Sequence, residues 1–401
     1  MQQKIQPLVK KLVLIGGGHS HAIVLRMFGM KPLPGVHLTL ISPALDTPYS
    51  GMLPGHIAGF YSRNECHINL QNLANFAQAQ LSLDQVVGLD LKHRKVICDN
   101  SPNVDFDVLS VDIGSTPAAI SVSGAAEYAI AAKPVAKLLK HWYELLESVA
   151  KNPQELIRIA IVGGGAGGVE LALSMQAHLH QILNNTQQPI QNLEIHLFQR
   201  SRQLMPNYHQ SVQSQVRQIL VERGVKLHLG ETVYQVAPSP NIDDEEIFEI
   251  KCESGLIIEC QKIFWVTQAS APQWLKTTGL GTDEQGFILV NDTLQSQTHP
   301  NVFASGDIAT MVNYPRPKAG VFAVRQGKPL FENLQRILLG KSLKPYKPQQ
   351  QYLSLIGTGD RRSLATKGSL TLPPHPLLWL WKDFIDRRFM KQFHNLPICK
   401  C

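Results

Sequence analysis

Residues Leu12–Ala22 read LVLIGGGHSHA, and this stretch decides the fold of the chain. Its four leading apolar residues predict a buried parallel strand, and the pattern after the glycines predicts a helix. A strand, a glycine turn and a helix N-terminus together bind the pyrophosphate of a dinucleotide, because the turn admits the phosphates and the helix offers free N–H groups. The third glycine of the usual G-x-G-x-x-G pattern is His21 here, so this copy alone is a weak signal.

A second, complete copy lies at Arg158–Glu170, which reads RIAIVGGGAGGVE. Two such units in a chain of 401 residues predict two dinucleotides bound together, and therefore a hydride passed between them. We expect the pyrophosphates to contact Gly16, Gly17, Gly18, His19 and Ser20 in the first turn, and Gly163, Gly165, Ala166 and Gly168 in the second. For His19 and His21 two roles stay open, packing against a cofactor or proton transfer.

Composition limits the remaining classes. Charged residues make up 17% of the chain and hydrophobic residues 44%, as in a soluble globular protein of two or three domains. No stretch is long enough for a transmembrane helix or has the form of a signal peptide, so we expect a cytoplasmic protein. The net charge of +7 fits anionic cofactors or a membrane surface, and no nucleic-acid-binding module is visible.

The six cysteines are scattered, and no C-x-x-C pair follows either glycine turn. A redox-active dithiol beside a flavin is therefore not expected, and neither is a metal site. Cys399 and Cys401 form a C-x-C at the chain end, for which an inert tail and a metal or redox site are the alternatives.

Several stretches around the first turn carry candidate cofactor contacts. Ser42 ends the second predicted strand, at the place where an acidic residue usually binds a ribose. Pro48 and Tyr49, in the loop TPYSGMLPG at Thr47–Gly55, are expected to form walls of a flavin pocket unless the loop is an ordinary surface turn. Gly114 and Ser115 end the strand predicted within Val104–Ala118, and Lys262–Pro272 echoes that stretch with Gln268 in place of the glycine.

Later in the chain, Asn301–Ile308 predicts an apolar strand that ends at Gly306-Asp307. The glycine allows close approach, and the aspartate can accept hydrogen bonds from the ribityl chain of a flavin. Lys318 then opens a helix, where a cation would favour the negative charge of a reduced flavin ring. The alternative for Lys318 is a solvated side chain.

The strand at Leu193–Phe198 ends in Gln199-Arg200-Ser201-Arg202. NAD sites usually have an acidic residue at this place, whereas a neutral residue near Arg200 and Arg202 suits the 2′-phosphate of NADPH. The sequence therefore favours NADPH over NADH. The alternative is that both arginines simply face solvent.

The tail Pro376–Phe393 is predicted to form an amphipathic helix. Its expected apolar stripe consists of Leu378, Trp381, Ile385, Phe389 and Phe393, with Lys382, Asp386, Arg387 and Lys391 elsewhere. An interfacial membrane anchor and a helix docked on the body or on a second subunit are the two interpretations. A peripheral protein on the inner face of a membrane and a homodimer both stay open.

Taken together, the motif order resembles the two-dinucleotide-binding flavoproteins of the pyridine nucleotide-disulfide oxidoreductase superfamily, over about residues 10–340. The stretches GGGHSH (16–21), TPYSGMLPG, RPKAGVFAVRQG (316–327) and WKDFIDRRFM (381–390) are similar to type II NADH dehydrogenase-like modules. In some bacteria that module is fused to selenide, water dikinase, a domain absent here. This resemblance implies FAD on the first turn, NAD(P)H on the second, Glu170 near the junction of nicotinamide and flavin, and Lys318 close to the flavin.

These observations predict an α/β protein with two Rossmann-like dinucleotide-binding domains and a helical tail. The expected FAD domain comprises residues 1–125 and 286–350, the NAD(P)H domain residues 126–285, and the C-terminal region residues 351–401. We expect an FAD-dependent NAD(P)H dehydrogenase that reduces an acceptor such as a quinone. The alternatives are a flavin-bearing partner or redox sensor with low turnover, and a reductase of selenium or sulfur species.

Overall fold

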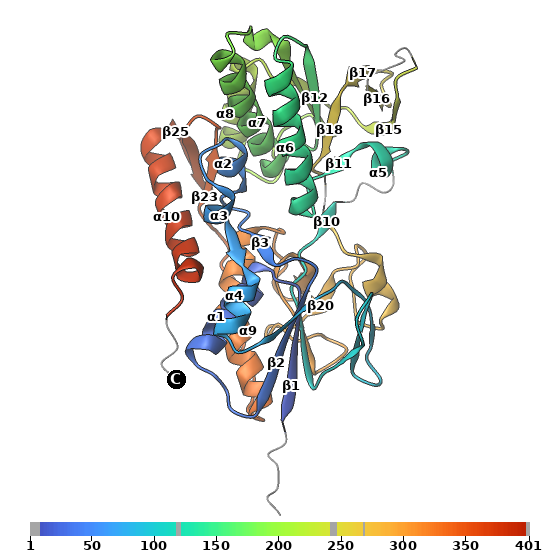
Figure 1. Ribbon diagram of the computed structural model, residues 1–401, viewed down its shortest axis with the longest axis vertical. Coiled ribbons are helices and arrows are strands. Elements are labelled where there is room, and N and C mark those ends of the chain that lie inside the picture. Colours follow the sequence, from blue (N-terminus) through green and yellow to red (C-terminus); the bar gives the residue numbers. More distant parts are fainter. Residues whose placement is uncertain (1–8, 118–121, 241–246, 268, 398–401) are drawn as a thin grey trace, which may run out of the picture.

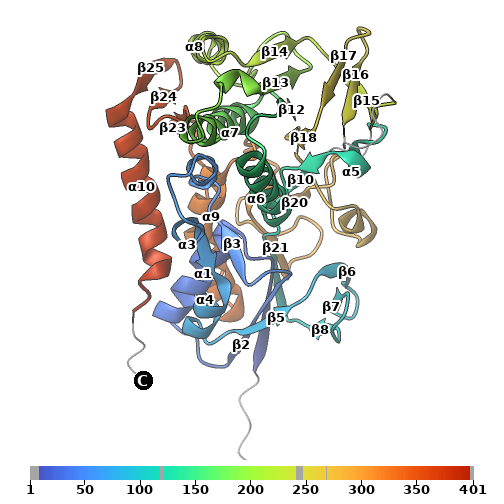
Figure 2. The ribbon, with the colours of Figure 1, turned by 45° about the horizontal axis from the view of Figure 1, so that its top comes forward.

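The computed structural model describes residues 9–117, 122–240, 247–267 and 269–397. Two parallel five-stranded sheets, each packed against helices, make up most of the molecule, and a long C-terminal helix runs along one side of both units (Figure 1). The view in Figure 2 separates the two units and shows the same helix beside each of them. The predicted α/β class, with two dinucleotide-binding units and a C-terminal helix, is confirmed.

The first sheet has the strand order β21-β9-β1-β2-β5. Its strands are β1 (Lys10–Ile15), β2 (Val36–Ser42), β5 (Gln80–Leu83), β9 (Val108–Val111) and β21 (Val302–Ala304). Helices α1 (His19–Met30), α4 (Leu70–Phe76) and α9 (Gly320–Leu338) pack together beside it. Strand β1 is buried from Leu12 to Ile15, as a central parallel strand covered on both faces must be.

The second sheet repeats this arrangement in the order β11-β18-β12-β13-β14. Its strands are β11 (Ile130–Ala131), β12 (Ile157–Val162), β13 (Leu193–Gln199), β14 (Lys226–Leu229) and β18 (Lys262–Trp265). The accompanying helices are α6 (Val135–Lys151), α7 (Ala166–Asn185) and α8 (Gln210–Glu222). Each glycine turn thus joins a central strand, β1 or β12, to the helix that follows it.

The chain crosses between the two units twice, and the two crossings pair with each other. Strand β10 (Thr116–Pro117) runs antiparallel to β19 (Ala269–Ser270), with Thr116 opposite Ser270. These are the two stretches that the sequence shows as echoes, although Ala118 and Gln268 lie outside the described residues. The single strand expected within Val104–Ala118 is divided into β8 (Val104–Asp105), β9 and β10.

Smaller elements complete the fold. Two antiparallel three-stranded sheets are β6 (Val86–Asp90), β7 (Lys95–Cys98) and β8 in the first unit, and β15 (Val233–Pro238), β16 (Phe248–Cys252) and β17 (Ile257–Cys260) in the second. The pairs β3 (Asp46–Pro48) with β4 (His67–Asn69) and β20 (Ile288–Val290) with β22 (Ala309–Met311) flank the first sheet, together with the short helices α2 (Leu53–Ile57) and α3 (Arg63–Cys66). Helix α5 (Ala125–Tyr128) contacts β15. The described residues also form the short 3-10 turns η2 (Ile190–Asn192), η3 (Gln273–Thr277) and η4 (Gly306–Ile308).

The C-terminal region forms a third antiparallel sheet followed by one helix. The sheet contains β23 (Ser354–Gly357), β24 (Ser363–Lys367) and β25 (Leu370–His375), and helix α10 spans Pro376–His394. Strand β23 packs on α7 of the second unit, whereas α10 also contacts α3 and β4 of the first. The C-terminal region therefore contacts both units.

The predicted apolar stripe of α10 is buried only towards its C-terminal end. Phe393 is buried and Phe389 packs against the core of the first unit, whereas Trp381 and Ile385 are exposed. The other buried side chains are Trp379, Lys382, Asp386 and Met390. Trp379 stacks on the Tyr61 ring with centroids 6.1 Å apart, and Lys382 pairs with Asp386. Because that ion pair faces inward, the helix is rotated from the orientation that its apolar residues alone would choose.

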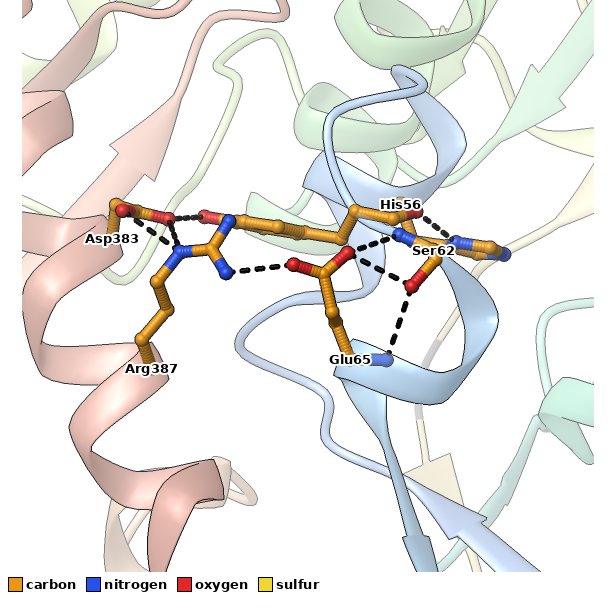
Figure 3. Close-up of polar contacts among 6 residues, drawn as sticks. His56, Ser62, Glu65, Asp383 and Arg387 are labelled. Atoms are coloured by element: carbon orange, nitrogen blue, oxygen red, sulfur yellow. Dashed lines mark hydrogen bonds and ion pairs between the residues drawn. The ribbon is translucent and has the colours of Figure 1, made fainter. Parts of the chain in front are cut away.

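A polar latch, defined here as Tyr61, Glu65, Asp383 and Arg387, fixes α10 to the segment around α3 (Figure 3). The Tyr61 hydroxyl donates to Asp383 over 2.7 Å, and Arg387 forms ion pairs with Asp383 at 2.9 Å and Glu65 at 2.7 Å. Ser62 caps α3 and shares a capping box with Glu65. The latch sets the position of α10 relative to the first unit.

None of the helices in the described part of the chain combines the length and apolar character that crossing a membrane requires.

Candidate functional site

Both glycine turns have the backbone geometry that a pyrophosphate cradle needs. Gly16 and Gly163 have φ of +88° and +124°, a conformation that side chains rarely permit. A Cβ on Gly168 would lie 1.8 Å from the carbonyl oxygen of Gly163, so the third glycine lets helix α7 pack directly on the turn. Gly165 faces open space, where a ligand can approach the N-terminus of α7.

His21 replaces that third glycine in the first turn with a hydrogen-bonded side chain. Its Nδ1 lies 2.7 Å from the Gly16 carbonyl oxygen, and its Nε2 lies 2.8 Å from the Ser110 hydroxyl on β9. Burial lowers the pKa of His21 to about 4, so the imidazole is neutral at physiological pH. His21 therefore joins the turn to strand β9 and is not placed to carry protons to a ligand.

Asp112 lies at the end of β9 beneath the same turn, and the sequence analysis missed it. Its carboxylate accepts the His21 backbone N–H over 3.1 Å, and a Cβ on Gly18 or Gly306 would approach that carboxylate to within 2.3 or 2.4 Å. Burial raises the pKa of Asp112 to about 7. A single acidic residue after a predicted strand gave no distinctive signal for this position.

The predicted walls of the flavin pocket meet at the start of α1. The edge of the His19 ring faces Tyr49, with centroids 5.4 Å apart, and a hydrogen bond joins His19 to the backbone of Pro48. Burial is the main cause of the lowered pKa of His19. Its Nε2 is buried without a hydrogen-bond partner in the described structure, so this nitrogen is available to a ligand.

Gly306 and Asp307 lie beside Ser115, as expected for residues that share one ligand. The Ser115 hydroxyl donates to Asp307 over 3.4 Å, and Gly114 has φ of +70° with open space on its Cβ side. Lys133 joins this group, because its Nζ lies 2.9 Å from both the Ser115 hydroxyl and the Asp307 carboxylate. No motif surrounds Lys133, so sequence patterns could not select it.

Ser42 and Lys318 have partners within the protein. The Ser42 hydroxyl donates to the carbonyl oxygen of Ala44 over 3.0 Å and is buried. The Lys318 ammonium donates to the Ala309 carbonyl oxygen over 2.7 Å and lies 4.0 Å from the centre of the Phe287 ring. Burial lowers the pKa of Lys318 to about 8, against the attraction of Asp283 and Asp307.

At the second turn, the Gln199 side chain closes the end of β13. Its Oε1 accepts the Gly164 N–H over 2.9 Å, and its Nε2 donates to the Ser201 hydroxyl over 2.7 Å. Arg200 and Arg202 are exposed beside it. The polar end of this strand therefore presents positive charge without a carboxylate.

Glu170 lies where α7 meets the C-terminal region. Its carboxylate accepts the Gly357 N–H of β23 over 2.8 Å. Burial raises the pKa of Glu170, and the nearby Lys382 opposes that shift. Asp386 in turn hydrogen-bonds to Tyr49, so these side chains of α10 connect Glu170 to the walls around the first turn.

The described cysteines offer no reactive thiol. Cys66, Cys98, Cys252 and Cys260 are all buried and unpaired, and burial raises the pKa of Cys66, Cys252 and Cys260 to about 12. Cys399 and Cys401 lie outside the described residues. Within the described ranges, no group of three or more His, Cys, Asp or Glu side chains is arranged to hold a metal ion.

Two glycine turns at helix N-termini, an unpartnered buried imidazole nitrogen and a Gly-Asp strand end suit two nucleotides, one beside each sheet. The fold and the site are thus those of an oxidoreductase with two dinucleotide-binding units. Residues 10–327 match the model of the family described as pyridine nucleotide-disulphide oxidoreductase. The chain belongs to this family.

Curated relatives and a solved structure extend this result. Ferroptosis suppressor protein 1 of Xenopus tropicalis is 26% identical over 84% of this chain and 83% of its own length. Demethylphylloquinone reductase NdbB of Synechocystis is 22% identical over 74% of this chain and 72% of its own. The fold is similar to that of NDH2 from Plasmodium falciparum in complex with NADH, with a TM-score of 0.78, 14% identity, and coverage of 97% and 99%.

Proposed function

We propose that this chain is an FAD-dependent NAD(P)H dehydrogenase that passes electrons to a quinone. The observation that carries the proposal is the pair of glycine turns on two sheets, linked through Glu170, Asp386 and Tyr49. Hydride transfer needs two rings stacked in a dry gap and no catalytic triad. The name of the Synechocystis relative, a demethylphylloquinone reductase, supports a quinone as acceptor.

On this proposal FAD occupies the first sheet. Its cradle comprises Gly16, Gly17, Gly18, His19, Ser20, Ser42, Pro48, Tyr49, Gly114, Ser115, Gly306 and Asp307. Lys133 is a further contact, because its ammonium already bonds to Ser115 and Asp307. Bound FAD supplies the two-electron chemistry, while the protein orients the ring and excludes water.

The nicotinamide nucleotide occupies the second turn, on Gly163, Gly165, Ala166 and Gly168. We infer a preference for NADPH, with Arg200 and Arg202 at the 2′-phosphate. The neutral Gln199 supports this preference, because its amide fills the place of the carboxylate that would repel a phosphate.

Glu170 and Lys318 are the proposed catalytic side chains. Glu170 stands on the nicotinamide side of the junction, with its carboxylate held by Gly357. Lys318 brings a positive charge to the first sheet near Asp307, where it would favour the negative charge of a reduced flavin.

We propose a division of the chain at the paired crossings β10 and β19. The sequence analysis put the return to the FAD domain at residue 286. Ala271, Leu275 and Leu280, however, pack in the core of the first sheet, which favours a return directly after β19. The NAD(P)H domain then ends at β19, and the C-terminal region beyond residue 350 contacts both domains.

We also propose that the protein works on the inner face of a membrane, where quinones dissolve. The outer side of α10 exposes Leu377, Leu380, Trp381, Phe384 and Ile385. An apolar helix face with tryptophan and basic neighbours suits the interface of a bilayer.

Anaerobic titration of the purified protein with NADPH and NADH tests the first half-reaction. We expect the oxidised flavin band to bleach rapidly, faster with NADPH, and to return when a quinone is added. If neither nucleotide bleached the band, the dehydrogenase proposal would be abandoned in favour of a partner or redox-sensor module. Return of the band with selenium or sulfur species but with no quinone would favour the third candidate.

A further inference from the structure

Helix α10 buries an ion pair on the side that packs against the rest of the protein. The Lys382 ammonium lies 2.6 Å from the Asp386 carboxylate, and each side chain is 7% exposed. Burying two charges costs desolvation free energy that apolar side chains of similar size would avoid. Trp381, Phe384 and Ile385 are exposed on the other side of the same helix. The helix therefore has apolar side chains that its buried side does not use.

Both members of the pair are fixed from outside the helix. Lys382 also donates to the Gly51 carbonyl oxygen. The Tyr49 hydroxyl hydrogen-bonds to Asp386, and the Tyr49 ring covers Gly51 so closely that a Cβ there would lie 2.8 Å from it. Tyr49 in turn meets the ring of His19 at the first glycine turn. A continuous polar chain thus runs from α10 to the proposed flavin wall.

The titratable side chains that face Asp386 differ in whether they can donate a proton at neutral pH. They are Lys382 on α10, Glu170 from α7, and Tyr49 and Tyr61 from the segment between β3 and α3. Burial raises the pKa of both tyrosines, with a further contribution from Asp386 at Tyr49 and chiefly from Asp383 at Tyr61, so neither phenol is an acid at neutral pH. Among these described groups, Lys382 is the cation that can supply a proton.

We propose that Asp386 is a positioning residue for quinone reduction, which holds the Lys382 ammonium and the Tyr49 hydroxyl in one buried chain. This inference rests on the proposed function. A quinone becomes a quinol by taking a hydride, which brings two electrons and one proton, and a second proton on its other oxygen. Lys382 gives that second proton and regains it from water before the next turnover.

Asp386→Asn tests the inference, because it keeps the shape of the side chain and removes the charge. We expect quinone turnover to fall by about a hundredfold, at the lower end of what a positioned acid contributes, because Lys382 itself remains. Turnover with ferricyanide, which takes electrons without protons, and anaerobic flavin reduction by the nucleotide should both stay at the wild-type rate. Loss of flavin reduction in the wild type itself would instead contradict the proposed function.

Asp383→Asn, on the same helix but in the polar latch, is the matched control and should keep its quinone turnover. Equal losses with quinone and ferricyanide, or no loss with either, would overturn the inference.

Discussion

His21 shows how one side chain can replace the third glycine of the G-x-G-x-x-G pattern. Gly168 leaves room for close contact between α7 and its turn, whereas His21 fills the corresponding space and bridges Gly16 to Ser110. The imidazole satisfies a carbonyl oxygen and a hydroxyl that would otherwise be buried without partners. The departure from the pattern therefore preserves the geometry of the first turn.

Asp112, below that turn, should make the stability of the apoprotein depend on pH. Its pKa rises from 3.8 in the unfolded chain to about 7 in the fold, so its stabilising contribution is complete below pH 3.8 and is lost as the pH rises through 7. We expect Asp112→Asn to melt higher than the wild type by an amount that grows between these pH values. Each pKa unit corresponds to about 1.4 kcal/mol. Parallel melting curves for both proteins across this range would contradict the assignment.

Gln199 offers a test of nucleotide choice with little change of shape. Gln199→Glu keeps the oxygen that accepts the Gly164 N–H and adds a negative charge beside Arg200 and Arg202. We expect the KM for NADPH to rise about tenfold, a loss of about 1.4 kcal/mol, with little change for NADH. Gln71→Glu on α4 adds the same charge to the other unit and serves as the control. An unchanged ratio of the two KM values would count against NADPH at this strand end.

The site residues that could be predicted from the sequence are those that stand in a recognisable local motif. Gly16, Gly163 and Gly306 stand in motifs whose spacing reports backbone geometry directly. Asp112 and Lys133 have no such context, because the residues that they contact lie far away in the sequence. Lys382 has Asp386 four residues further along, but its contact with Gly51 also joins distant parts of the chain. These contacts arise only in the folded structure.

At the scale of elements, α10 is the clearest difference from prediction. Its helical character and limits followed from periodicity, but its rotation did not. The inward side is chosen by Lys382 and Asp386, whose partners Gly51 and Tyr49 come from another part of the chain. A hydrophobic stripe cannot report such a choice, since it ranks apolar side chains only.

The polar latch should govern how firmly α10 is held. Arg387→Ala removes two ion pairs and the contact of the guanidinium with the Tyr61 ring, 5.1 Å away, at a site that is about half exposed (Figure 3). We expect a loss of about 1 kcal/mol, because exposed pairs contribute little each, and faster amide hydrogen exchange within 376–394. Arg388→Ala, at an exposed neighbour, should leave exchange unchanged. Equal exchange in the two variants would show that the apolar contacts of Trp379 suffice.

At the scale of the whole molecule, α10 follows directly on β25, where Leu370 and Leu372 are exposed as well. With a net charge of +7, this surface should favour anionic bilayers. We expect Trp381→Ser/Phe384→Ser to reduce cosedimentation with anionic vesicles at least about fivefold, with an unchanged melting temperature. Val221→Ser/Ile257→Ser removes exposed apolar side chains elsewhere and is the control. Equal binding by both variants would exclude α10 as the contact.

The order of strands in the first sheet has a consequence for synthesis. Strand β21, which pairs with β9, is synthesised only after every strand of the second sheet. The inserted unit therefore holds all its strands while its host still lacks an edge. Folding during translation should complete the inner unit first, and the nascent host must keep the open side of β9 from pairing with another chain until residues 302–304 arrive.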